Sequence, residues 1–94
     1  MPVAIEMDFP GATLEQYDQI LEKMGLEPGG STPDGAIFHW VTQTPQGVRI
    51  VDVWETQEAF DKFAEEQIGP YSQEVGLPEP KVEFVEVYNY LTGA

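Results

Sequence analysis

The chain has 94 residues, with 17 Asp or Glu against four Lys or Arg, so its net charge is −13. This acidity excludes nucleic acid and anionic membranes as partners, because both are bound through clustered basic side chains. With no cysteine and one histidine, disulfides and Cys/His zinc sites are excluded. We expect one globular domain, residues 1–94, located in the cytoplasm, with no signal peptide and no membrane span.

The first half of the chain reads as strand, helix and loop. Residues 2–9 place apolar side chains at every second position, which predicts a strand with one strongly apolar face. Residues 13–24 repeat apolar side chains at helical spacing, and Thr13 begins a capping box. Gly25 is suited to the position that ends a helix. Residues 25–36, rich in Gly and Pro, predict a long loop that could act as a lid.

The second half reads as a hairpin, a helix and a last strand. Residues 37–44 and 47–55 are rich in β-branched and aromatic side chains, with a turn sequence between them. Thr56 is a predicted N-cap of a helix that the Gly-Pro pair at 69–70 stops or kinks. Residues 81–91 predict the last strand.

The order β-α-β-β-α-β predicts a ferredoxin-like α+β domain. Its four-stranded antiparallel sheet has the order 4-1-3-2, with both helices on one face. The other face is then bare, although strands 37–44 and 81–91 carry apolar side chains on both faces. An exposed apolar patch of this size is unusual for a monomer. We therefore expect a homodimer through the sheet face, the alternative being a monomer in which the tail or the loop covers it.

The same order, together with the segment RIVDVWETQEAFDKFAEE, resembles the dimeric α+β barrel superfamily, and within it the antibiotic biosynthesis monooxygenase-like group. That group includes cofactor-independent oxygenases of polyphenols, polyketide cyclases and haem-degrading proteins. The resemblance implies a pocket between helices and sheet, with Trp54 facing it. Several oxygenases of the group have a histidine in the helix after the third strand, where this chain has Phe60 or Phe63.

The turn at 45–46 determines where the only histidine lies. With a two-residue turn, His39 stands opposite Asp52 and Ile37 opposite Trp54. A three-residue loop would move these side chains to opposite faces. A carboxylate beside a histidine fixes its tautomer and strengthens it as a base. We therefore predict His39 as general base and Asp52 as its partner; the alternatives are a pair that only lines a ligand site and an ordinary structural pair.

The sequence also predicts which residues contact the substrate. Predicted substrate contacts are Trp54, Tyr71, Phe63, Ile37 and Tyr88, while Tyr17 is predicted to face the core. We expect no metal and no cofactor. The leading hypothesis is a small cofactor-independent enzyme, a monooxygenase or a cyclase/isomerase, acting on an aromatic or polyketide-like molecule. The alternative is a non-catalytic protein that binds a small apolar or aromatic ligand. Haem handling is disfavoured, because few Arg or Lys exist to pair the propionates.

Overall fold

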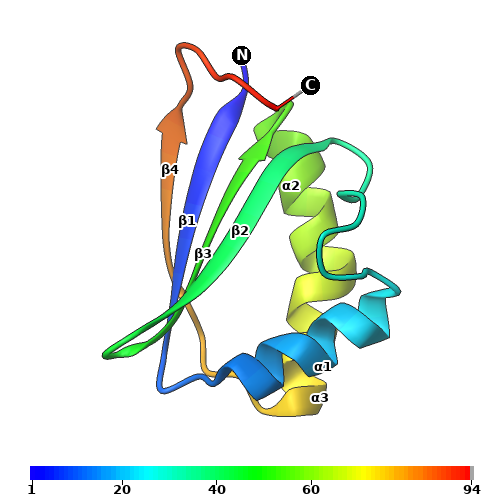
Figure 1. The fold of residues 1–94 in the computed structure, drawn as a ribbon, viewed down its shortest axis with the longest axis vertical. Helices are drawn as coiled ribbons and strands as arrows, with labels where there is room; N and C mark the ends of the chain where they lie inside the picture. Colours follow the sequence, from blue (N-terminus) through cyan, green and yellow to red (C-terminus); the bar gives the residue numbers. More distant parts are fainter. Residues whose placement is uncertain (94) are drawn as a thin grey trace.

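The computed structural model describes residues 1–93. In chain order the elements are β1 (Val3–Pro10), α1 (Leu14–Met24), β2 (Ala36–Thr44), β3 (Gly47–Trp54), α2 (Gln57–Phe63), the π-helical turn η1 (Ala64–Ile68), α3 (Gly69–Val75) and β4 (Lys81–Glu86). The strands form one antiparallel sheet in the order β2-β3-β1-β4, which is the predicted order read from its other edge. All helices lie on one side of this sheet (Figure 1). The ferredoxin-like α+β fold is confirmed.

The core lies between the helices and β1, which is a central strand. Its alternating residues Val3, Ile5, Met7 and Phe9 are all buried on the helix side, as the sequence pattern predicted. Trp54 closes this layer and is only 1% exposed. Because burying one large apolar side chain contributes about 1.5–3 kcal/mol, this layer is a major source of the stability of the chain.

The capping box of α1 is present in full. The N–H of Gln16 donates to the Thr13 hydroxyl at 3.2 Å, and the Gln16 side chain accepts from the Thr13 N–H at 3.0 Å. Gly25 ends the helix in the left-handed conformation, with φ of 75°. Both predicted ends of this helix are confirmed.

The second helix continues past the Gly-Pro pair. The N–H of Gly69 bonds to the carbonyl of Ala64, five residues back, and so closes the π-helical turn η1. Pro70 then falls in the first turn of α3, a position where its fixed φ is compatible with a helix. A stop at 69–70 is therefore wrong, because the chain continues as a helix through α3; the alternative, a kink at this pair, stays a prediction.

Strand β4 is shorter than the predicted 81–91. It pairs only with β1, and its last residue, Glu86, stands opposite Val3, where β1 begins. One further bond joins the N–H of Val87 to the carbonyl of Pro2. Residues 87–91 have a strand-like sequence but no remaining neighbour to pair with, so they leave the sheet. Tyr88 is consequently 97% exposed.

The outer face of the sheet changes from apolar to charged along the strands. One end row consists of apolar residues from all four strands, namely Phe38, Val53, Ala4 and Val85; the opposite end row is polar, namely Thr42, Arg49, Asp8 and Lys81. Phe38 is 52% exposed and Trp40, one row further in, is 43% exposed. The single chain therefore leaves an apolar surface bare on the side away from the helices.

Candidate functional site

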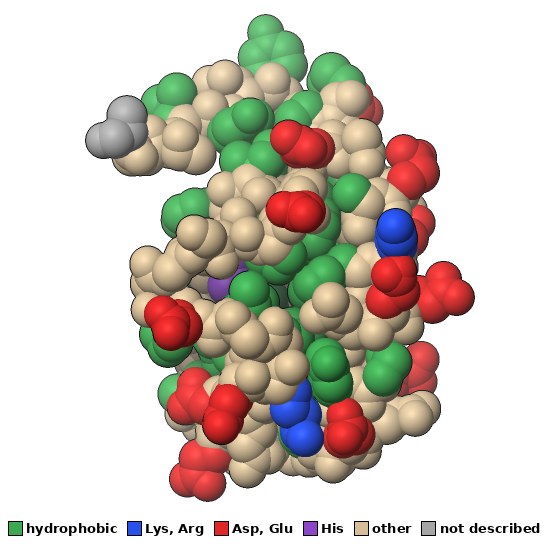
Figure 2. All heavy atoms as spheres, turned by 90° about the vertical axis from the view of Figure 1, so that its right-hand side faces the viewer, with side chains coloured by type: hydrophobic (Ala, Val, Ile, Leu, Met, Phe, Trp, Pro, Cys, Tyr) green, Lys and Arg blue, Asp and Glu red, His purple; other side chains and the backbone are tan. Residues whose placement is uncertain are grey.

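A cavity of about 380 Å³ lies between the sheet and the helices. Strands β1, β2 and β3 form one wall, α1 and the α2–α3 helix form others, and loop residues 26–33 close one side. Figure 2 shows a hollow on this side of the molecule, where apolar side chains and the single histidine are visible. Its walls are mainly apolar, and no Lys or Arg lines it. This size and lining suit a small organic ligand without a strong negative charge.

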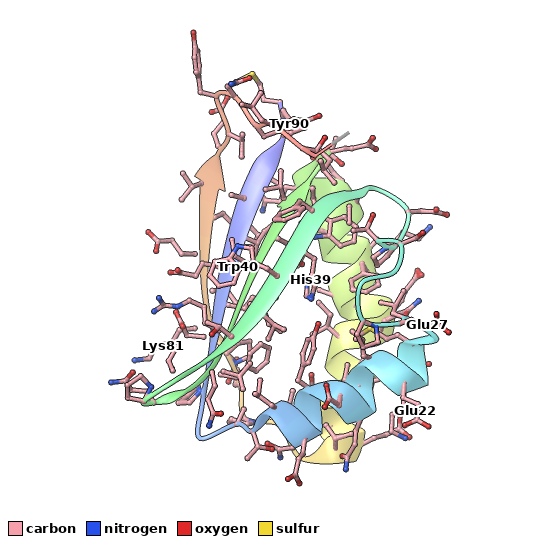
Figure 3. The ribbon with its side chains drawn as sticks, viewed as in Figure 1. Glu22, Glu27, His39, Trp40, Lys81 and Tyr90 are labelled. Atoms are coloured by element: carbon pink, nitrogen blue, oxygen red, sulfur yellow. The ribbon has the colours of Figure 1, made fainter. Side chains whose placement is uncertain are left out.

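Three polar residues of the cavity wall are joined to one another by hydrogen bonds. His39 Nδ1 lies 2.6 Å from Asp52 Oδ1, and His39 Nε2 lies 2.6 Å from the hydroxyl of Tyr17. Figure 3 shows His39 pointing into the space between sheet and helices, while its neighbour Trp40 points to the other side. Asp52 is 5% exposed and His39 is partly buried, so this series of hydrogen bonds runs from the protein interior to the cavity.

The partners of His39 determine its tautomer. An ionised carboxylate can only accept hydrogen bonds, so the proton of the neutral imidazole sits on Nδ1 and is donated to Asp52. Nε2 then presents its one lone pair, which accepts the hydroxyl proton of Tyr17. This is the arrangement in which a carboxylate orients a histidine for proton transfer at Nε2.

Trp54 completes the shell around the buried carboxylate. Its indole N–H donates to Asp52 Oδ2 at 3.1 Å, so both carboxylate oxygens are hydrogen-bonded. Its ring packs against Phe60 and Phe63, with ring centroids 5.7 and 5.2 Å away. Since a buried charge without partners is costly, the two N–H donors explain how Asp52 is tolerated in this core.

The phenol of Tyr17 is held in its neutral form. Partial burial raises its pKa to about 12, and the negative charges of Asp52 and Asp18 add to the effect. Its ring lies nearly parallel to the imidazole of His39 and meets it edge to edge through the hydroxyl, with centroids 5.9 Å apart and planes at 10°. At neutral pH Tyr17 is therefore a hydrogen-bond donor to His39 rather than a phenolate.

The structure brings together four of the predicted residues. The two-residue turn and the pairing of His39 with Asp52 are confirmed, and Trp54 and Phe63 line the same cavity. What these residues do there remains a prediction. Tyr71 and Tyr88 are not among the lining residues; the first is half-buried elsewhere and the second lies beyond the shortened β4, almost wholly exposed.

The predicted pairing of Ile37 with Trp54 is wrong. A bulge between Ala36 and Phe38 shifts the register, so that Ala36 stands opposite Trp54 and Ile37 has no partner. A β-bulge places two residues of one strand opposite one residue of its partner, so the pairing before the bulge is displaced by one position. Ile37 consequently does not line the cavity.

Tyr17 belongs to the site although the sequence does not place it there. Its position on the apolar stripe of its helix predicts a residue that faces the core. A buried tyrosine hydroxyl needs a partner, however, and His39 is the one basic ring predicted on the facing side of the sheet. The sequence does not place Ser72 there either: its buried hydroxyl lines the cavity and has no hydrogen-bond partner within the described residues.

The π-helical turn aligns part of this wall. Phe63, Ile68 and Ser72 all line the cavity. In an α-helix, residues five apart lie about 140° apart around the axis, so Phe63 and Ile68 would point in different directions. The turn closed over five residues returns them to one side, and Ser72 follows one α-helical turn later.

Two other kinds of feature are missing from residues 1–93. No helix in that range has the length and apolar character needed to cross a membrane. Nor do three His, Cys, Asp or Glu residues in it come together as metal ligands would.

Comparison with known proteins gives a likeness in structure only. No family model matches the chain, and no curated protein matches it. Among solved structures, SnoaB, a cofactor-independent oxygenase from Streptomyces nogalater, is 13% identical, with a TM-score of 0.60 over 98% of this chain and 97% of its own. A candidate antibiotic biosynthesis monooxygenase from Deinococcus radiodurans is 13% identical, with a TM-score of 0.54 over 100% and 99%. The chain shares the fold of these proteins, as its resemblance to the monooxygenase-like group predicted.

Proposed function

We propose that this chain is a small cofactor-independent enzyme, an oxygenase or a cyclase/isomerase, that acts on an aromatic or polyketide-like molecule in the cavity. The observation that carries the proposal is the hydrogen-bonded chain from Asp52 through His39 to Tyr17 at the cavity wall. The name of SnoaB supports the same kind of chemistry, since that protein is an oxygenase without a cofactor and has this fold.

In the proposed reaction His39 receives a proton from the substrate and Asp52 stabilises the resulting imidazolium. Removing a proton from a phenol, or from carbon next to a carbonyl, leaves an electron-rich anion. Such an anion can react with O₂ or close a ring without help from a metal. Proton transfer by a positioned histidine contributes typically about 10²–10⁴-fold in rate.

The cavity wall supports an aromatic substrate. Phe63 is partly buried and lines the cavity, and the buried ring of Trp54 packs against it with centroids 5.2 Å apart. Aromatic surfaces favour planar ligands through offset or edge-to-face contacts. Loop residues 26–33 include two glycines and two prolines, and they would close over a ligand that entered from that side.

A non-catalytic binding protein is the second candidate. The observation that favours it is that every polar atom of His39 and Asp52 already has a partner within the protein. A network satisfied in this way can be a structural device that orders the cavity wall. The apolar cavity alone would then hold the ligand.

We also propose that the protein is a homodimer through the outer face of the sheet. Phe38, Trp40 and Val85 expose apolar surface there, between 43% and 56% of each residue. Packing two such faces together would remove this surface from water and leave the cavities of the two subunits separate.

The test of the proposed function is turnover of a panel of hydroxylated naphthalenes and anthracenes. O₂ uptake and product formation are followed without added metal or cofactor, for the wild type, His39→Gln and Asp52→Asn. We expect turnover of at least one compound, and a rate about 10²-fold or more lower in His39→Gln with binding retained. Binding without any turnover would favour the second candidate, and neither binding nor turnover would reject both.

A further inference from the structure

We propose that Tyr17, rather than His39, is the group that touches the substrate, and that the substrate enters as a neutral hydroxyl compound whose proton passes through the Tyr17 hydroxyl. This inference rests on the proposed function, because it names the contact residue and the substrate class of the same site.

The hydrogen-bonding capacity of His39 is already used. Its one N–H, at Nδ1, is bonded to Asp52, and its one lone pair, at Nε2, accepts from Tyr17, each at 2.6 Å. A neutral imidazole has nothing further to offer a ligand. The Tyr17 oxygen, by contrast, still has lone-pair capacity after donating its proton, and Tyr17 lines the cavity. A substrate hydroxyl can therefore donate to Tyr17 without breaking any bond of the network.

The proposed step moves two protons, one from the substrate to Tyr17 and one from Tyr17 to His39. The O–H bond of the substrate breaks and a new O–H bond forms on Tyr17, while the former Tyr17 O–H bond breaks and an N–H bond forms at Nε2. The electron pair stays on the substrate as an alkoxide-type or phenolate-type anion, and Tyr17 ends as a neutral phenol. Because both protons move together, Tyr17 never has to exist as a phenolate. That agrees with the burial and negative charges that keep its hydroxyl protonated.

The charges of the cavity indicate the substrate class. Asp52 is the buried negative charge, Glu27 also lines the cavity, and no Lys or Arg does. A substrate that entered as an anion would add a second negative charge facing Asp52 with no cation to oppose it. A neutral substrate avoids this, because the negative charge on it and the positive charge on His39 arise in the same step. Carboxylates and phosphate esters are therefore disfavoured, and neutral phenols or enols are favoured.

The test uses 4-nitrophenol, whose phenolate absorbs visible light while its neutral form does not. The probe is titrated with protein at a pH below its own ionisation, for the wild type, Tyr17→Phe, His39→Gln and Tyr90→Phe. Tyr90 is a control tyrosine outside the cavity lining. A second measurement records the Nδ1–H signal of His39 by NMR, which reports whether its bond to Asp52 is intact.

We expect the wild type and Tyr90→Phe to bind the probe and to show the phenolate band. His39→Gln should bind the probe without the band, because the proton acceptor is gone. Tyr17→Phe should lose the band and bind about tenfold more weakly, while the Nδ1–H signal remains.

Three results would contradict the inference. An undiminished band in Tyr17→Phe would mean that substrate reaches Nε2 directly, which overturns the role of Tyr17 and leaves the proposed function standing. Loss of the band together with the Nδ1–H signal would make Tyr17 a structural support of the His39–Asp52 pair. A wild type that does not bind the probe would count against the cavity as a phenol site, and so against the proposed function and this inference together.

Discussion

The sheet contains two acid–base pairs whose partners stand directly across from each other on neighbouring strands. One pair is largely buried and the other is more exposed. His39 stands directly across from Asp52, and Arg49 directly across from Asp8. The contacts are similarly short, 2.6 Å for Nδ1 to Oδ1 and 2.8 Å for Nε to Oδ1. The first pair faces the helices, where the Asp52 side chain is 7% exposed. The second faces outward, where the side chains of Asp8 and Arg49 are 34% and 42% exposed.

The difference shows that burial, and not pairing, makes one of these pairs a candidate site. Arg49 also lies 3.5 Å from Glu6, and its hydrogen bond to Asp8 and both carboxylate charges raise its pKa, so it simply stays charged. Water screens such a surface cluster. Asp52 is almost inaccessible to water, so His39 and Trp54 supply its hydrogen bonds.

The largest expected effect is on the free energy of unfolding, and it differs between the two pairs. The carboxylate of Asp52 accepts from the N–H of His39 and from the N–H of Trp54. In Asp52→Asn the amide has one oxygen and one NH₂ group, so it faces one of these two donors with N–H groups of its own. We expect a loss of about 2–4 kcal/mol in the free energy of unfolding, because a buried donor is left without a partner. Asp8→Asn should change it only slightly. Urea unfolding of both variants, at one protein concentration, measures the contrast; equal effects would mean that burial does not distinguish the pairs.

The next largest expected effect is on dimerisation through the outer face of the sheet. Trp40→Glu places a charge in the apolar part of that face, so we expect the dimer dissociation constant to rise at least about tenfold. Leu14→Glu is the matched control, because Leu14 is 40% exposed, close to the 43% of Trp40, but lies on α1. Sedimentation of the three proteins over a concentration series gives the constants. A monomeric wild type, or equal weakening by both variants, would reject this interface.

The smallest expected effect is on the stability of the protein in alkaline solution, where Tyr17 ionises. The pKa of Tyr17 is raised from 10.0 to about 12 in the folded protein, so the neutral phenol favours folding. This contribution is complete below pH 10 and disappears as the pH rises through 12, because the unfolded chain releases the proton first. The stability advantage of the wild type over Tyr17→Phe should therefore shrink between these pH values. Urea unfolding across the range checks it, and a constant difference would contradict a raised pKa.

The sequence predicts most of the fold because its local signals agree with one another. The alternation in residues 2–9 and the capping box at Thr13 both depend on near neighbours, and both are confirmed. The facing of His39 and Asp52 could also be predicted, because a two-residue turn fixes the register of a whole hairpin.

The predictions fail where the structure depends on residues that are far apart in the sequence. Strand β4 ends at Glu86 because β1 offers no further partner, which the residues after it cannot reveal. The bulge between Ala36 and Phe38 leaves Ile37 without a partner, although the turn at 45–46 predicts an uninterrupted register. The contact of Tyr17 with His39 depends on how α1 crosses the sheet, and a helical stripe does not specify which residue its hydroxyl will meet.

The π-helical turn η1 makes one wall of the cavity depend on how a helix is wound. A π-helical turn holds one residue more than an α-helical turn, so removing a single residue from Ala64–Ile68 would restore regular α-helical winding with Phe63 and Ser72 still on one side. If all five residues were kept and wound as regular α-helix, everything after them would instead rotate by about 100° about the helix axis, and Ser72 would turn away from the cavity. The lining of this wall is thus set by the winding of η1 as well as by the identity of its side chains.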